Sequence, residues 1–234
     1  MCLTEFIEDQ IWLKEYPVKY AGCKFNARMS VVRINDSELV LHSPCDVDEE
    51  TASAISALGN VSCILAPGSF HYMHIPSAQR AFPEAETYVC PGVEQKCPDM
   101  SFDWILGPRA PEAWSSTMDQ VLIRGNRFMW EVAMFHRSSK TLLLVDAIEN
   151  FTDQTEGVSW QVMVLWKLIL RMWNRPKPAP EYQIGWKSKQ AAAYSLRSVL
   201  EWDFDRIIVS HGDNITEDAK ERARKAWRVP LTEA

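Results

Sequence analysis

Histidine and aspartate side chains occur where predicted strands end. These side chains are His42 in LVLHSP, His71 and His74 in APGSFHYMH, Asp146 in LLLVDAIENF and His211 in IIVSHGD. Neutral imidazoles and a carboxylate are ordinary ligands of Zn²⁺ or Fe²⁺, and the same groups act as general acids and bases. Loops at strand ends are where α/β proteins bring such side chains together. The pattern therefore favours a metal site or an acid–base site that includes Asp146.

Each of these residues also has an ordinary structural interpretation. Asp146 could begin a turn after its strand, His74 could cap a helix that follows it, and His42 could be a buried histidine bonded to the backbone. The fifth histidine, His136, precedes the turn RSSK of a predicted hairpin, where a structural role is favoured. The choice between these interpretations depends on the elements that position the side chains.

Short apolar runs predict strands through the first third of the chain. They are QIWLKEYPV, MSVVRI and ELVLHS, and NDS forms a tight turn between the second and the third. This order predicts an antiparallel meander. The segment CDVDEETASAISALGN then predicts a helix of about three turns, with a capping box from Asp46 to Glu49 and Gly59 as its terminator.

The middle of the chain alternates between strand and helix. VSCILAPG and ETYVCPG are predicted strands on either side of the short helix PSAQRAFP, and MDQVLIRG, WEVAMFH and TLLLVD return to antiparallel strands. Helices over about 157–174 and 187–202, the strand RIIVSHG and a helix from about 216 complete the chain. Two groups of strands with helices outside both predict an α/β fold, α+β by layer: an αββα sandwich of two mixed sheets in a single domain over residues 1–234.

Composition excludes several classes of protein. A net charge of −6 and a pI near 5.4 argue against nucleic-acid binding, because phosphate contacts require a dominant basic face. The N-terminal segment MCLTEFIEDQIW lacks the apolar core of a secretory signal, so we expect a cytoplasmic protein. The 6 cysteines form no Cys-x-x-Cys pair, which predicts reduced thiols rather than a thiolate zinc site or a disulfide framework.

A tryptophan-rich segment, VSWQVMVLWKLILRMW, is the longest apolar stretch. It is too short to span a bilayer comfortably and is interrupted by Lys167. Trp160, Trp166 and Trp173 have near-helical spacing, which favours a helix that covers the core. Alternatively the same residues could line a pocket, rest on a membrane surface or form a homodimer through the helix near 158–174.

Several segments together resemble one family over almost the whole chain. They are RMSVVRI, LVLHSP, ALGNVSCILAPGSFHY, AFPEAETYVCPG, DQVLIRG, FHRSSKTLLLVDAIENF and WDFDRIIVSHGD. These segments resemble the metallo-β-lactamase superfamily and, within it, a group described only as a domain of unknown function. The resemblance implies two β-sheets between helices, with a site at one edge of the sheets.

The resemblance also implies a ligand set. In the superfamily a His-x-His-x-Asp-His loop, a further His, a bridging Asp at a strand end and a final His hold one or two metals, usually zinc. Asp146 matches the bridging Asp and His211 matches the final His. His71 and His74 match the second and the last His of the loop.

Other positions depart from that ligand set. Ser69 and Met73 stand where the first His and the Asp of the loop belong, and Tyr72 departs from the adjacent histidines of the group. RGNRF contains no counterpart to the further His. The metal ligands that the resemblance implies are therefore His71, His74, Asp146 and His211, which suffice for at most one ion of Zn²⁺ or Fe²⁺.

Two functions are consistent with these residues. The first, which we favour, is a metal-dependent hydrolase of a small ester, lactone, thioester or amide. Asp146 would orient or deprotonate water, His42 or Tyr72 would stabilise the oxyanion, and Glu131 and Asn150 would be hydrogen-bond partners of the site. The alternative is a metal-free, catalytically silent scaffold that binds a small ligand or a protein partner.

Overall fold

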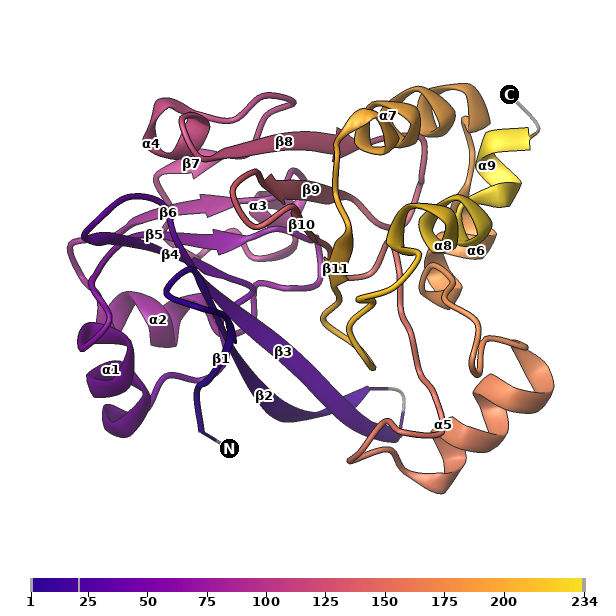
Figure 1. Ribbon diagram of the computed structural model, residues 1–234, viewed down its shortest axis with the longest axis horizontal. Coiled ribbons are helices and arrows are strands. Elements are labelled where there is room, and N and C mark those ends of the chain that lie inside the picture. Colours follow the sequence, from indigo (N-terminus) through magenta and orange to yellow (C-terminus); the bar gives the residue numbers. More distant parts are fainter. Residues whose placement is uncertain (1, 21, 233–234) are drawn as a thin grey trace.

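The strands form two mixed sheets that pack face to face in the computed structural model, which describes residues 2–20 and 22–232 (Figure 1). Within these residues the first sheet has seven strands in chain order. They are β1 (Thr4–Ile7), β2 (Ile11–Tyr20), β3 (Cys23–Arg33), β4 (Glu38–His42), β5 (Asn60–Ala66), β6 (Glu86–Val89) and β7 (Trp104–Ile105). The pairs from β1 to β4 are antiparallel and those from β4 to β7 are parallel, as the predicted meander followed by alternating strands and helices requires.

The second sheet has the order β11-β10-β9-β8 in the described part of the chain. Its strands are β8 (Met118–Ile123), β9 (Glu131–His136), β10 (Thr141–Leu143) and β11 (Arg206–Ile208). β8, β9 and β10 pair antiparallel, whereas β10 and β11 pair in parallel. Parallel strands end at the same edge of a sheet, so the segments that carry Asp146 and His211 leave the sheet side by side.

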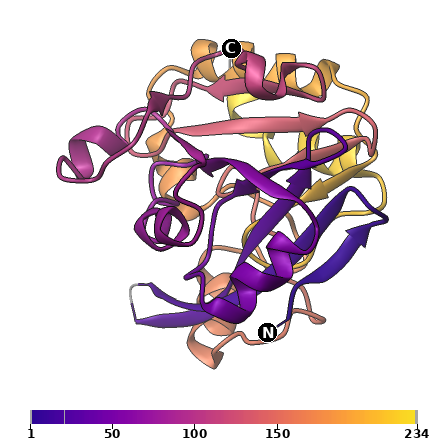
Figure 2. The same ribbon diagram turned by 90° about the vertical axis from the view of Figure 1, so that its left-hand side faces the viewer.

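Helices cover the outer faces of both sheets, which confirms the predicted αββα sandwich. α1 (Glu49–Ser56) and α2 (Ile75–Ala81) lie on one side of the sheets, while α6 (Pro180–Gly185), α7 (Lys189–Glu201), α8 (Ala219–Ala226) and α9 (Arg228–Thr232) lie on the other (Figures 1 and 2). Two single-turn helices, α3 (Val93–Lys96) and α4 (Glu112–Ser115), flank β7.

Apolar side chains from both sheets form the central core. Met29 and Val31 of β3 and Leu41 of β4 pack in one cluster with Val132 of β9 and Leu143 of β10. A second cluster joins the other face of β9–β11 to α7 and α8. The parallel strands are buried on both faces, which explains why their sequences read as continuous apolar runs.

The first helix begins later than its predicted capping box. α1 starts at Glu49, and its N-cap is Asp48, whose side chain accepts a hydrogen bond of 2.8 Å from the Thr51 backbone N–H. Asp46 is therefore not the cap. Asp48 is the N-cap because its carboxylate lies three residues before the backbone N–H of Thr51, which is the spacing that an N-cap requires.

The tryptophan-rich helix is shorter than predicted. α5 covers Trp160–Val164, a π-helical turn η1 covers Leu165–Ile169, and the chain then reverses at Arg171, which has φ 51°. Trp166 is buried under the β2–β3 pair with Phe25 and Phe151, but Trp160 is 69% exposed. No helix in the described residues is long and apolar enough to cross a membrane.

Candidate metal centre

Asp146 owes its position to a buried glutamate at the start of β9. The backbone N–H groups of Val145, Asp146 and Ala147 donate to the Glu131 carboxylate at 2.8, 2.9 and 2.7 Å. These three bonds satisfy backbone groups that follow the last β9–β10 pair, Leu143 with Met134, while Leu144 still donates to the β11 carbonyl of Ile208. Burial and the charge of Asp146 raise the pKa of Glu131 to about 7, against the three N–H groups that favour its ionised form. Glu131 is thus a hydrogen-bond partner of the site, as the sequence predicts.

His211 follows β11, and three hydrogen bonds position it and the adjacent Gly212. Arg28 donates to the carbonyl of Gly212 at 2.9 Å, the Asn150 backbone N–H donates to the carbonyl of His211 at 3.1 Å, and Nδ1 of His211 lies 3.3 Å from the carbonyl oxygen of Asn26. A carbonyl oxygen can only accept, so Nδ1 carries the proton of the neutral ring. Nε2 of His211 therefore presents a lone pair.

His71 reaches the same place from the loop after β5. Its Nδ1 lies 2.8 Å from the Ser43 hydroxyl, which fixes the ring and leaves Nε2 directed at Asp146. Ser43 has φ 56°, a left-handed conformation that is unusual for serine. Gly68 allows the loop to approach, because a Cβ at that position would lie 2.8 Å from Cγ2 of Val145.

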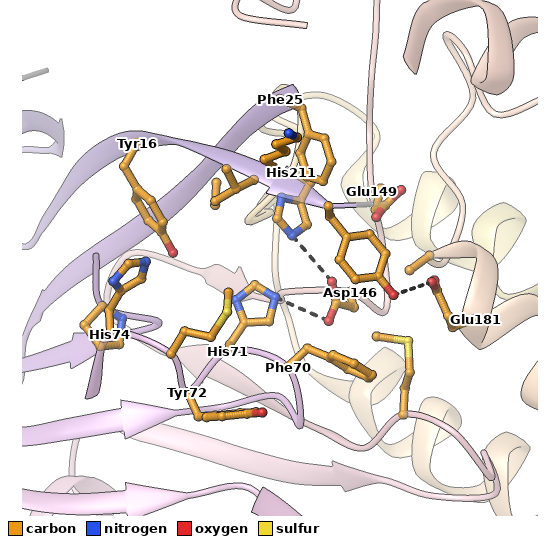
Figure 3. Close-up of a pocket in the computed structure, with 18 residues that line it drawn as sticks. Tyr16, Phe25, Phe70, His71, Tyr72, His74, Asp146, Glu149, Glu181 and His211 are labelled. Carbon is orange, nitrogen blue, oxygen red and sulfur yellow. Dashed lines mark hydrogen bonds and ion pairs between the residues drawn. The ribbon is translucent and has the colours of Figure 1, made fainter. Parts of the chain in front are cut away.

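The three side chains converge on one point. His71 Nε2 lies 3.3 Å from Oδ2 of Asp146, and His211 Nε2 lies 3.6 Å from Oδ1 (Figure 3). One ligand atom from each residue lies within 4.8 Å of the other two. For metal–ligand bonds of about 2.0–2.2 Å, tetrahedral geometry separates neighbouring ligand atoms by about 3.3–3.6 Å. The group His71, Asp146 and His211 could therefore hold a single metal ion.

The electrostatics of Asp146 and His211 suit a cation. Burial alone would raise the pKa of Asp146, but His71 and His211 outweigh it and hold that pKa below its ordinary value. Burial alone would lower the pKa of His71, but the charge and hydrogen bond of Asp146 hold it above the ordinary value. Burial lowers the pKa of His211 to about 4. At neutral pH Asp146 is therefore ionised and His211 is neutral, which are the forms that bind a metal, whereas Asp146 favours a proton on His71 that a metal ion would have to displace.

A pocket of about 190 Å³ opens beside the three residues. The β2–β3 pair, the loop after β5, the segment after β10 and the start of α6 form its wall. That wall includes Tyr16, Phe25, Phe70, Tyr72, Glu149 and Glu181 (Figure 3). Aromatic side chains thus surround a small polar centre, which is the usual character of a small-molecule site.

The structure brings three of the four predicted ligands together. His74, the fourth, lies at the N-cap of α2 with its ring edge-on to Tyr16 at a centroid distance of 5.3 Å, outside the group of three. Burial lowers the pKa of His74. It lines the pocket on the side of Tyr16, where a bound molecule could contact it.

The remaining predicted site residues occupy different places. Tyr72 lines the pocket. His42 is buried at the end of β4, does not line the pocket, and has an Nε2 without a hydrogen-bond partner among the described residues. Burial lowers the pKa of His42 to about 3. His136 bonds Ser139 at 2.7 Å within the β9–β10 hairpin, as its predicted structural role requires.

Two residues of the site do not follow from the sequence pattern. Ser43, rather than its neighbour His42, reaches His71. Glu149 lines the pocket, is 5% exposed, and accepts a hydrogen bond of 3.2 Å from Nε1 of Trp166. Burial and the charge of Asp146 raise the pKa of Glu149 well above its usual range. The available signal for Glu149 was its position as an acid three residues after Asp146, in a segment that has no exposed face.

Comparison with known families gives one match. The model of the family described as Domain of unknown function (DUF4336) matches residues 8–167. No curated protein sequence matches the chain significantly.

Several solved structures with similar folds are metallo-β-lactamases. The structure of VMB-1 has a TM-score of 0.68 at 9% identity, over 99% of this chain and 96% of that one. The metallo-β-lactamase from Pontibacter korlensis has a TM-score of 0.65 at 9% identity, over 97% and 98%. FIM-1 from Pseudomonas aeruginosa, in its mono-zinc form, has a TM-score of 0.64 at 10% identity, over 99% and 95%. At such low identity the likeness establishes a metallo-β-lactamase-like fold and does not extend to activity.

Proposed function

The chain belongs to the family described as Domain of unknown function (DUF4336), and from its fold and its site we propose that it is a metal-dependent hydrolase. The substrate would be a small ester, lactone, thioester or amide that fits a pocket of about 190 Å³. One ion of Zn²⁺ or Fe²⁺ would be held by His71, Asp146 and His211.

The spacing between His211 and Asp146 carries this proposal. Nε2 of His211 is an acceptor because its Nδ1 donates to Asn26, and it faces an ionised oxygen of Asp146 at 3.6 Å. Two acceptors repel each other unless a cation or a shared proton lies between them. A neutral imidazole and a carboxylate at this distance are a suitable pair of ligands for one divalent ion.

The chain's own residues would carry most of the mechanism. A bound ion would polarise the substrate carbonyl and lower the pKa of a water molecule. Three protein ligands leave a coordination position open, as catalytic sites require. Asp146 has two carboxylate oxygens in the pocket and would orient the attacking water with one of them. Phe70 and Tyr72 would pack on the acyl group and exclude bulk water.

The comparisons support a single ion. FIM-1 is described in a mono-zinc form, so a protein of similar fold has been seen with one zinc. In the described residues of the present chain the one group with metal-ligand spacing consists of three side chains. Three ligands are too few for two adjacent ions, which would also need a bridging group and further donors.

A catalytically silent scaffold is the second candidate. The observation that favours it is the position of His74, which leaves the loop after β5 with one ligand instead of two. In this alternative His71, Asp146 and His211 would form a hydrogen-bonded cluster on the wall of a ligand-binding pocket.

Hydrolysis by the metal-loaded protein tests the two against each other. Protein freed of metal by a chelator and reloaded with Zn²⁺ or Fe²⁺ would be assayed with an aryl ester, a lactone, a thioester and an anilide. We expect turnover that chelation abolishes, a loss of about 100-fold or more in kcat/KM for His211→Ala, and no comparable change for His136→Ala. Turnover that is the same with and without metal would refute the proposal, and the absence of both metal binding and turnover of any substrate would favour the scaffold.

A further inference from the structure

One side of the pocket is acidic and aromatic, and nothing in the proposed metal chemistry requires it to be. We propose that this side selects substrates that carry an organic ammonium group. The ammonium group would contact Glu149 and Glu181 while the scissile carbonyl lies at His71, Asp146 and His211. This inference rests on the proposed function for the reaction, and on the pocket alone for the recognition of the cation.

The two glutamates lie together on one side of Asp146. Glu149 belongs to the segment after β10, and Glu181 lies in the first turn of α6 (Figure 3). His74, Tyr16 and Tyr72 lie on the opposite side of the pocket (Figure 3). A substrate that spans the pocket therefore places one end between two acids and the other end among neutral rings.

Glu149 has bonding capacity that the protein does not use. It is 5% exposed, its Oε2 accepts from Trp166, and within the described residues its Oε1 has no hydrogen-bond partner. Its Oε1 is not fully enclosed by protein and Glu149 lines the pocket, so a donor or a cation in the pocket can reach this oxygen. The raised pKa of Glu149 is caused by burial and the negative charge of Asp146, and a cation would relieve both.

Glu181 joins the acidic side to the tip of the β2–β3 pair. Its carboxylate accepts a hydrogen bond of 3.0 Å from the hydroxyl of Tyr20. Tyr20 and Phe25 both line the pocket, so aromatic rings stand beside the two acids. Carboxylates combined with aromatic rings recognise ammonium groups, because the ring face attracts a cation and tolerates its methyl or methylene groups.

The position of the acids favours an ammonium group over an anion. The wall carries the carboxylates of Asp146, Glu149 and Glu181, and among the described residues its one Lys or Arg side chain is Lys19, which is exposed. Lys96 lies behind the ring of Phe70, outside the wall. A divalent ion at Asp146 and the charge of Lys19 together offset these three carboxylate charges, so net charge alone does not select the substrate. Position does, because Glu149 and Glu181 lie on the same side of the pocket, where an ammonium group contacts two acids and a carboxylate or phosphate group finds no cation.

A matched pair of probes tests the recognition without turnover. Choline and 3,3-dimethylbutan-1-ol have the same shape, and the quaternary nitrogen of choline has no lone pair with which to bind a metal. Titration calorimetry on the zinc-loaded protein should show that choline binds in the millimolar range or better, and about tenfold or more tightly than the alcohol. The double variant Glu149→Gln with Glu181→Gln should reduce that ratio to near one, while Glu50→Gln, an exposed acid on α1, should leave it unchanged.

Further measurements separate the two proposals. Thermal melting checks that the double variant folds, and the single variant Glu181→Gln, which alters a partly exposed side chain, should lower the ratio by an intermediate amount. Acetylcholine and 3,3-dimethylbutyl acetate extend the test to turnover, where the cationic ester should have the higher kcat/KM. Equal binding of choline and the alcohol, or undetectable choline binding, would overturn the inference whether or not esters are hydrolysed. Preferential choline binding without hydrolysis of these esters or of the lactone, thioester and anilide would overturn the proposed function alone.

Discussion

Nε2 of His211 lies 3.6 Å from Oδ1 of Asp146, and both atoms are hydrogen-bond acceptors. The backbone carbonyl of Asn26 sets this relationship, because it accepts a hydrogen bond from Nδ1 of His211 and so keeps the proton of the ring on that nitrogen. The strand β3 thus determines which nitrogen of a histidine in the other sheet faces the site. Metal affinity should depend on this arrangement as much as on the ligands themselves.

Removal of a ligand should abolish tight metal binding. We expect Asp146→Ala and His211→Ala to weaken Zn²⁺ binding by more than about 100-fold, because the loss of one of three ligands exceeds the 10–100-fold cost of losing an outer partner. Titration calorimetry of metal-free protein should show one ion per chain, with His136→Ala as the unaffected control. Two tight ions per chain would contradict the ligand set.

Ser43 should influence the site through His71. Ser43→Ala and Ser43→Gly both remove the hydroxyl that lies 2.8 Å from Nδ1, so both should weaken Zn²⁺ binding by about 10- to 100-fold. Their stabilities should differ, because φ is 56° at this position and alanine tolerates that value less well than glycine. We expect the glycine variant to unfold at a free energy about 1 kcal/mol higher than the alanine variant. Equal metal affinity in wild type and both variants would show that the hydroxyl has no role.

Buried His136 should make the protein less stable in acid. Burial lowers its pKa from 6.5 to about 4 in the folded state, whereas the unfolded chain takes up a proton near 6.5. The unfolded state therefore binds more protons between these values, and stability should fall as the pH drops from about 6.5 to about 4. The contribution is of the order of 1–3 kcal/mol. Denaturant unfolding at several pH values should show a smaller decline in His136→Gln, and identical slopes would contradict the assignment.

The exposed side of α5 and η1 should associate with a second copy of the chain. Trp160, Leu168 and Ile169 are 69%, 72% and 70% exposed, which is a large apolar surface for a helix of two short turns. Sedimentation velocity should show a concentration-dependent dimer that Trp160→Ser with Leu168→Gln dissociates. Tyr194→Ser, at an exposed position on α7, is the matched control. A monomer at all concentrations would contradict this expectation.

The fold follows from the sequence to a large extent because its signals are local. Alternating and continuous apolar runs predict β2 through β6 and β8 through β11, and the parallel pairing follows from helices between strands. The tryptophan-rich helix is one exception. Its apolar residues suggest one continuous helix, but the chain must reverse at Arg171 to carry residues 177–179 back alongside the segment after β10. Tertiary contacts of this kind are invisible to helical periodicity.

The site could be predicted only in part for a related reason. Asp146 and His211 follow buried strands, and that position alone suggests convergence. The choice between His74 and the other histidines depends on the direction of each side chain in a loop, which residue type does not reveal. The hydrogen bond from Ser43 to His71 depends on a left-handed backbone conformation at Ser43. The role of Glu149 depends on which face of an irregular segment meets the pocket.

The parallel pairing of β10 with β11 also bears on when the site forms during synthesis. β11 begins at Arg206, so a growing chain acquires His211 long after His71 and Asp146 have left the ribosome. Until β11 docks, Asp146 has one imidazole neighbour instead of two, and the Asn26 carbonyl has no histidine to orient. The group His71, Asp146 and His211 is therefore complete only after β11 docks, and a metal ion held by it would hold the late strand in place.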